Sequence, residues 1–220
     1  TYYFKTEGIV KAVDDVSFII PKGKIVAIVG ESGCGKTATA LSIVNLIPNP
    51  PGKIVDGKIW FESKDLVALS EEEIRTIRGK DIGMVFQEPS VALNPVLTIG
   101  VQLTEGMIEH LKLPKSEAIK RACTLLDSVG IPNPKNWLSQ YPFQMSGGMR
   151  QRLMIAIALS CNPKLIIADE PTTALDVTIQ AQVLDLMKNI SDESKVSILI
   201  ITHNLGIVAR YSDYVNVMYA

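Results

Sequence analysis

Residues 30–37 carry the clearest chemical signal in the sequence, Gly30-Glu31-Ser32-Gly33-Cys34-Gly35-Lys36-Thr37. The pattern Gly-x-x-x-x-Gly-Lys-[Ser/Thr] is typical of a phosphate-binding loop. Its glycines let the backbone curl so that successive N–H groups face an anion, and the following helix adds the positive end of its dipole. Lys36 can reach the β- and γ-phosphates, and the Thr37 hydroxyl can hold Mg²⁺. The predicted nucleotide-binding set is Gly30, Ser32, Gly33, Cys34, Gly35, Lys36 and Thr37; Thr39 is not included.

Besides the loop, hydrolysis of a nucleotide needs a metal ligand and a group that activates water, and two adjacent carboxylates can supply both. Asp169 and Glu170 follow Leu165-Ile166-Ile167-Ala168, an apolar run that predicts a buried strand. They therefore lie at the carboxyl end of a strand, where open α/β sheets bind ligands. We expect Asp169 to hold Mg²⁺ through water, and Glu170 to orient or deprotonate the attacking water.

A second anion-binding arrangement occurs at Ser146-Gly147-Gly148. A serine before two glycines at the start of a helix offers a hydroxyl, bare N–H groups and the helix dipole. One nucleotide needs only one such cradle. The second therefore suggests a site for a nucleotide bound by another subunit.

The elements that must position these residues alternate between strand and helix. Apolar, β-branched runs predict strands at 16–20, 24–29, 58–62, 82–86, 165–169, 197–202 and 214–218. Helical patterns cover 36–47, a short segment from the capping box at Ser70 to Gly79, and 176–190. Between about 98 and 160 the strand signal disappears, and helices are predicted at 98–113, 116–129 and 146–160.

This order predicts an α/β core interrupted by a helical subdomain. We expect residues 1–92 and 161–220 to form the nucleotide-binding core and 93–160 to form the insert. The sequence starts with Thr and stops directly after a strand-like run, so we expect it to be part of a longer protein whose C-terminal remainder is absent.

Composition excludes several other classes. The 220 residues carry a net charge of −1, so no global basic field points to nucleic acid as a partner. Three dispersed cysteines predict neither a disulfide framework nor a zinc site. No apolar stretch approaches the roughly 20 residues of a membrane span.

Further segments complete an ordered set of motifs: Val85-Phe86-Gln87, Ser146 to Gln151, Ala174-Leu175-Asp176 and Ile201-Thr202-His203. Together with the phosphate loop and Asp169-Glu170, they resemble the ATP-binding-cassette (ABC) ATPase family over nearly the whole chain. Met149 departs from the family, in which Gln is commoner. The resemblance implies a P-loop NTPase (RecA-like) fold with a mostly parallel sheet, an N-terminal antiparallel β region and the inserted helical subdomain.

The resemblance also implies roles for individual residues. Two copies, or two related chains, would pair head to tail, so that Ser146, Gly147 and Gly148 face ATP bound to the other subunit. Gln87 would contact Mg²⁺ or the attacking water, and His203 the γ-phosphate. Asp176 would organise the interface, and an aromatic residue before the core would stack on adenine. Tyr3 is the candidate for that stacking, with Tyr2 and Phe4 beside it; an aromatic edge strand is the alternative interpretation.

Within the family, the segment from Phe86 to Gly100 and the residues Gly30 to Lys36 resemble the importers of oligopeptides, dipeptides and nickel. Glu31 replaces the more general Pro, whereas Thr37 and Phe143 depart from the Ser and His usual in that subfamily. The resemblance implies an ATPase at the cytoplasmic face of the membrane, peripherally bound to permease subunits that an extracytoplasmic binding protein supplies with substrate.

Two other functions remain open at this point. One is an ABC ATPase outside transport, acting in DNA repair, chromosome organisation or translation. The repair and chromosome types split the core with a long coiled coil, and no heptads lie between Thr37 and Leu165. The other is a nucleotide switch or kinase-like P-loop protein, which leaves Ser146 to Gln151 unexplained.

Overall fold

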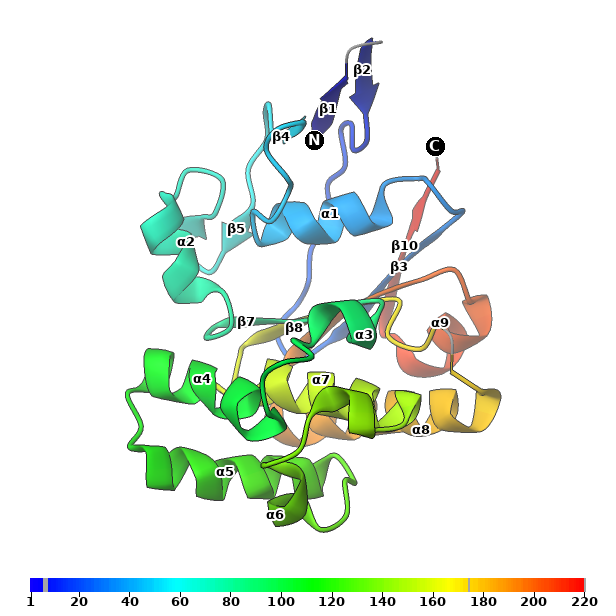
Figure 1. The fold of residues 1–220 in the computed structure, drawn as a ribbon. Helices are drawn as coiled ribbons and strands as arrows, with labels where there is room; N and C mark the ends of the chain where they lie inside the picture. The colour runs from blue at the N-terminus through cyan, green and yellow to red at the C-terminus, as the bar shows by residue number, and fades with distance from the viewer. Residues whose placement is uncertain (6–7, 174, 220) are drawn as a thin grey trace.

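A five-stranded parallel sheet lies at the centre of the computed structural model, which describes residues 1–5, 8–173 and 175–219 (Figure 1). Its strand order is β10-β3-β9-β8-β7. The strands are β3 (Ile25–Gly30), β7 (Ile82–Val85), β8 (Leu165–Asp169), β9 (Ser197–Thr202) and β10 (Tyr214–Met218). All four neighbouring pairs are parallel. The residues that follow these strands therefore meet at one edge of the sheet, as in other open α/β folds.

Alternating side chains bury both faces of the sheet. In β8, Leu165 and Ile167 belong to one hydrophobic cluster, whereas Ile166 and Ala168 belong to another. The first cluster includes residues of α1 (Lys36–Ile43) and α2 (Glu71–Ile77), and the second those of α7 (Gly147–Leu159) and α8 (Val177–Ser194). Two buried faces explain why the strands read as continuous apolar runs. Figure 1 shows α1 above the sheet and α7 and α8 below it.

Helices fill the chain between β7 and β8. They are α3 (Pro89–Ala92), α4 (Ile99–Leu111), α5 (Lys115–Ser128), α6 (Pro134–Trp137), the short 3-10 helix η1 (Pro142–Gln144) and α7. Buried side chains of α4 and α5, including Leu103, Met107 and Leu126, join the same hydrophobic cluster as Ile166. The strand-free stretch is thus confirmed, and α5 and α6 lie at the bottom of Figure 1, with α4 above α5. The division at residues 93 and 160 stays a prediction.

The N-terminal region is antiparallel, as predicted. Strands β1 (Tyr2–Lys5), β2 (Gly8–Lys11) and β4 (Gly52–Lys53) form a sheet in the order β2-β1-β4. A hairpin of β5 (Trp60–Phe61) and β6 (Lys64–Asp65) follows. The last helix, α9 (Leu205–Tyr211), lies between β9 and β10.

Three sequence predictions need correction. The predicted strand at 16–20 is wrong: no described strand pairs with it, and Ile19 is 80% exposed. Only Trp60 and Phe61 of the strand predicted at 58–62 are in a strand, because the hairpin to β6 is so short. The helix predicted at 36–47 ends at Ile43, and Asn45 takes a left-handed φ of 50°.

Helix starts agree better with prediction. The predicted capping box is present before α2. The Ser70 side chain accepts from the N–H of Glu73, and the Glu73 side chain accepts from the N–H of Ser70. Ser146 and Asp176 are the N-caps of α7 and α8. Within the described ranges, every helix is too short or too polar to cross a lipid bilayer.

Candidate nucleotide site

The predicted phosphate loop connects β3 to α1, and its glycines are required by its geometry. Gly33 and Gly35 have φ angles of 88° and 95°, a region that side chains disfavour. A Cβ at Gly35 would collide with the carbonyl oxygen of Ala12, and one at Gly30 with that of Met218. At its glycines the loop presents backbone without side chains, directly before the N-terminus of α1. This arrangement fits an anion.

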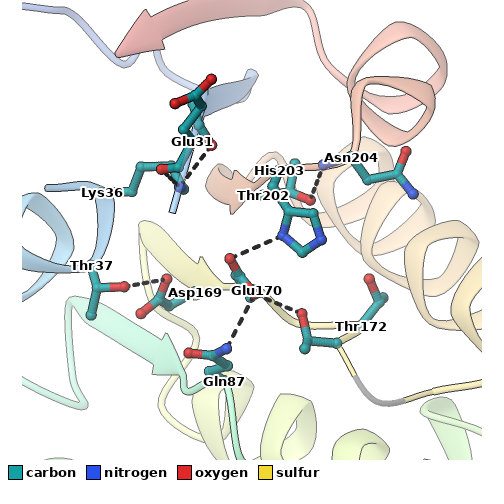
Figure 2. A network of polar contacts seen from close by, with 12 residues as sticks. Glu31, Lys36, Thr37, Gln87, Asp169, Glu170, Thr172, Thr202, His203 and Asn204 are labelled. Carbon is teal, nitrogen blue, oxygen red and sulfur yellow. Dashed lines mark hydrogen bonds and ion pairs between the residues drawn. The ribbon is translucent and has the colours of Figure 1, made fainter. Parts of the chain in front are cut away.

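The ammonium group of Lys36 is held inside this loop. Its Nζ donates to the carbonyl oxygens of Gly30 at 2.9 Å and Glu31 at 2.8 Å, and the residue is buried (Figure 2). The Sγ of Cys34 lies 3.9 Å away, and its side chain is also buried. The thiol of Cys34 is therefore enclosed, and its N–H donates to the carbonyl oxygen of Glu31 at 3.4 Å. Lys36 can exchange these neutral acceptors for a phosphate oxygen.

Thr37 and Asp169, the two predicted Mg²⁺ ligands, are in contact with each other. The hydroxyl of Thr37 donates to Oδ1 of Asp169 at 3.2 Å, joining the first turn of α1 to the end of β8. Burial raises the pKa of Asp169, the hydrogen bond from Thr37 opposes that change, and the charge of Glu170 adds to it. A hydroxyl and a buried carboxylate are hard oxygen donors, and Mg²⁺ binds through one or two carboxylates together with water and phosphates. This pair therefore fits the metal.

Glu170 is the centre of a polar network. Figure 2 shows this network together with Glu31, Lys36 and Thr37 of the phosphate loop. The backbone of Glu170 has a left-handed φ of 45°, and its N–H donates to the carbonyl of Ile201 on β9. One carboxylate oxygen, Oε1, lies 3.2 Å from Nδ1 of His203. The other, Oε2, accepts from Nε2 of Gln87 at 3.2 Å and from Oγ1 of Thr173 at 2.8 Å.

These contacts keep the carboxylate ionised. Burial by itself would raise the pKa of Glu170, but hydrogen bonds from Thr173 and His203, with the charge of Lys36, outweigh it and lower that pKa. The side chain of Glu170 is 16% exposed and that of His203 is 62% exposed. The carboxylate is thus an anion at the rim of a site that solvent can enter.

The structure brings together residues that are far apart in sequence. Gln87 follows β7, Glu170 follows β8, His203 follows β9 and the phosphate loop follows β3. Because those four strands are adjacent and parallel, their ends place four segments of the chain around one space. Proton transfer to Glu170 and charge stabilisation by Lys36 are the chemistry that this arrangement allows.

Ser146, Gly147 and Gly148 are not part of this group. The Oγ of Ser146 accepts from the N–H of Met149 at 3.3 Å, and no hydrogen bond between described residues connects it to the phosphate loop. A Cβ at Gly148 would lie 2.9 Å from Cγ2 of Ile179. The Oδ1 of Asp176 accepts from two N–H groups of α8. Ala174, in the motif with Asp176, lies outside the described residues.

The candidates for adenine stacking occupy β1. The ring of Tyr3 packs over Gly52, where a Cβ would lie 2.8 Å from its Cε1 atom. Tyr2 is engaged elsewhere, because its hydroxyl donates to Asp14 and Lys11 lies over its ring. Phe4 is 45% exposed. Tyr3 as the stacking residue stays a prediction.

The sequence reasoning missed two polar contacts near these motifs. Thr173 donates the shortest hydrogen bond to Glu170, and Arg150 of α7 contacts Ser90 of α3. The signal for Thr173 was a hydroxyl residue three positions after the carboxylate, but that spacing alone specifies no contact. Ser90 and Arg150 are 60 positions apart and carry no such signal.

Comparison with known proteins gives one consistent result. The family model described as ABC transporter matches residues 13–173. The oligopeptide transport ATP-binding protein AppD of Bacillus subtilis (strain 168) is 56% identical over 219 residues, which cover 100% of this chain and 67% of that protein. The dipeptide transport ATP-binding protein DppD of the same organism is 56% identical over 213 residues, covering 97% of this chain and 64% of that protein.

Solved structures agree with these relatives. The cassette MJ0796, described as a dimeric bacterial ABC transporter cassette, is 30% identical with a TM-score of 0.87, covering 99% of this chain and 90% of that one. Its post-hydrolysis dimer bound to ADP and Pi gives a TM-score of 0.86 at the same identity and coverage. The P-loop NTPase fold is therefore confirmed. This chain spans about 61–67% of the length of the curated transport proteins AppD, OppD and DppD.

Proposed function

The chain belongs to the ABC transporter family, and from that premise we propose that it is the ATP-hydrolysing subunit of a peptide importer. The observation that carries the proposal is the convergence of Lys36, Asp169 and Glu170 at the carboxyl edge of the parallel sheet, where β3 and β8 lie on either side of β9. The relatives described as oligopeptide and dipeptide transport ATP-binding proteins support the cargo class. They also disfavour a non-transport ABC ATPase and a kinase-like switch.

Each residue of the site has a proposed role in hydrolysis. The N–H groups of residues 30–37 and the ammonium of Lys36 bind the β- and γ-phosphates, as helix N-termini and nests bind anions. Glu170 accepts a proton from water, whose oxygen bonds to the γ-phosphorus while the bond to the β–γ bridging oxygen breaks. ADP and phosphate are the products. His203 and Gln87 orient the γ-phosphate and the water around that carboxylate.

Thr37 and Asp169 would hold Mg²⁺, which would supply positive charge to neutralise the charge that develops on the phosphate oxygens. Thr37 would contribute its hydroxyl, and Asp169 would act through water. Gln87 would approach the same ion from the end of β7. Removal of Mg²⁺ is therefore expected to abolish hydrolysis.

We propose that the complete site needs a second subunit. Ser146 and Gly147 are exposed and Gly148 is half-buried at the start of α7, and all three lie outside the network around Glu170. This placement supports a contribution to a nucleotide bound by another subunit. Asp176 would stand at the same interface, and Tyr3 would stack on adenine. The partner is a second copy or a related chain in a head-to-tail dimer, which binds permease subunits at the cytoplasmic face of the membrane. An extracytoplasmic binding protein would deliver the peptide.

The substitution Glu170→Gln tests this function in the full-length protein. It keeps the shape of the side chain but removes the proton acceptor. We expect phosphate release to fall by about 100-fold or more, because general-base catalysis contributes roughly that much. ATP should still bind and should now accumulate a dimer, measured by light scattering.

The matched control is Glu193→Gln, which changes an exposed glutamate of α8 far along the helix from the site. It should hydrolyse ATP at the normal rate. If the Glu170→Gln protein still releases phosphate, or stays monomeric with ATP, the proposed role of Glu170 is wrong.

A further inference from the structure

Thr173 makes the shortest contact to the carboxylate of Glu170. Its Oγ1 lies 2.8 Å from Oε2, compared with 3.2 Å for Nε2 of Gln87 at the same oxygen and 3.2 Å for Nδ1 of His203 at Oε1. Short hydrogen bonds to a charged acceptor are the stronger ones. Thr173 is therefore the main donor to Oε2.

Local backbone geometry sets this contact. The N–H of Thr173 donates to the carbonyl oxygen of Glu170 at 3.1 Å, which closes a four-residue turn with Pro171 in its second position. Proline is favoured at that place because its φ is already fixed. The left-handed φ of Glu170 lies at the start of the same turn. The turn folds the hydroxyl of Thr173 back onto the carboxylate three residues before it.

The other two donors reach Glu170 from different strands. Gln87 follows β7, and His203 follows β9 with a side chain that is 62% exposed. Both also have a proposed task at the nucleotide. Thr173 differs from them because it belongs to the same turn as Glu170, so its contact does not depend on how separate strands are placed.

We propose that Thr173 is a positioning residue for ATP hydrolysis: it holds Oε2 of Glu170 so that Oε1 is the oxygen turned toward the attacking water. This inference rests on the proposed function, because it assigns Thr173 a role only if Glu170 is the base. A base fixed within a few tenths of an ångström of its productive place transfers protons more effectively than a rotating one. Thr173 itself does not contact the reacting atoms.

Two substitutions separate the hydroxyl from the rest of the side chain. Thr173→Val keeps the shape and removes the donor, whereas Thr173→Ser keeps the donor. In the full-length protein we expect Thr173→Val to lower kcat for ATP by about 10-fold with KM changed less than about twofold, because positioning acts on the transition state. Thr173→Ser should retain kcat within about threefold.

The matched control is Thr172→Val in the same turn. The hydroxyl of Thr172 accepts from Nε2 of Gln180 and not from Glu170, so this change removes a hydroxyl without touching the carboxylate. We expect its kcat to stay within about twofold of normal. Nucleotide affinity and far-ultraviolet circular dichroism show whether each variant folds, and Thr173→Ala provides a second loss of the hydroxyl if Thr173→Val does not.

The results distinguish failure of this inference from failure of the proposed function. If Glu170→Gln abolishes hydrolysis while the valine and alanine variants keep normal kcat, Thr173 is not a positioning residue. Equal loss in the serine and valine variants, or a loss confined to KM, would also overturn it. If Glu170→Gln hydrolyses ATP normally, the assignment of the base is itself wrong.

Discussion

The guanidinium of Arg150 donates a 2.7 Å hydrogen bond from Nη1 to the hydroxyl of Ser90. Arg150 lies in the first turn of α7, four residues after Ser146, and Ser90 lies in α3, three residues after Gln87. One hydrogen bond thus joins the helix that begins at the Ser146 loop to the segment that carries Gln87.

We predict that Ser90→Ala weakens this connection. Loss of an acceptor from a charged donor should lower the free energy of unfolding by about 1 kcal/mol, which is about 2–4 °C in Tm for a chain of this size. Thermal unfolding followed by circular dichroism measures the change. Ser90→Thr retains the hydroxyl and is the control; an unchanged Tm in the alanine variant would show that the bond contributes nothing.

Lys36→Ala should remove most of the affinity for ATP. The ammonium is preorganised inside the loop by the carbonyls of Gly30 and Glu31, so its loss removes a charge-assisted contact with the phosphates. We expect the Kd for ATP to rise by about 100-fold, measured by calorimetry. Lys22→Ala, at an exposed lysine before β3, should bind normally. Unchanged affinity in the Lys36 variant would exclude Lys36 from the site.

Asp169→Asn should stabilise the nucleotide-free protein while it impairs Mg²⁺-dependent hydrolysis. Burial raises the pKa of Asp169 in the folded state, so its charged form opposes folding above that pKa. Removing the charge should therefore raise Tm at pH 7–8. This gain in Tm should vanish as the pH falls through the raised pKa of Asp169. The native carboxyl is then protonated and uncharged, like the amide of the variant.

Tm measured against pH for both proteins tests this prediction. Asp192→Asn, at an exposed carboxylate of α8, is the control and should show no such gain. An Asp169 variant that is less stable than the native protein at pH 8 would mean that the bond from Thr37 outweighs the burial of the charge.

Much of the sheet could be predicted because its strands are buried on both faces. The runs at 165–169, 197–202 and 214–218 match β8, β9 and β10 residue for residue. The run at 16–20 has the same composition, yet it forms no strand among the described residues. An apolar, β-branched run indicates only that the segment can adopt a strand. The strand forms only where a neighbouring strand supplies its hydrogen bonds.

The site, too, contains residues that the sequence could predict and residues that it could not. Lys36, Thr37, Asp169 and Glu170 belong to motifs whose spacing reflects their chemistry, and the structure places them together. Thr173 could not be found by spacing, because its contact depends on the left-handed φ of Glu170 and on the turn that follows. Arg150 and Ser90 meet only through the packing of α7 against α3, and no local pattern encodes it.

The position of β3 has a consequence for how the chain folds. The strand that leads into the phosphate loop spans residues 25–30, but its two neighbours, β9 and β10, come from residues 197–218. On a ribosome, β3 therefore has neither neighbour until nearly all of this chain has been synthesised. Pairings this distant are slow to form and leave apolar strands exposed meanwhile. A truncation that removes only β9 and β10 would thus leave the loop sequence intact but without the strands that hold it in place.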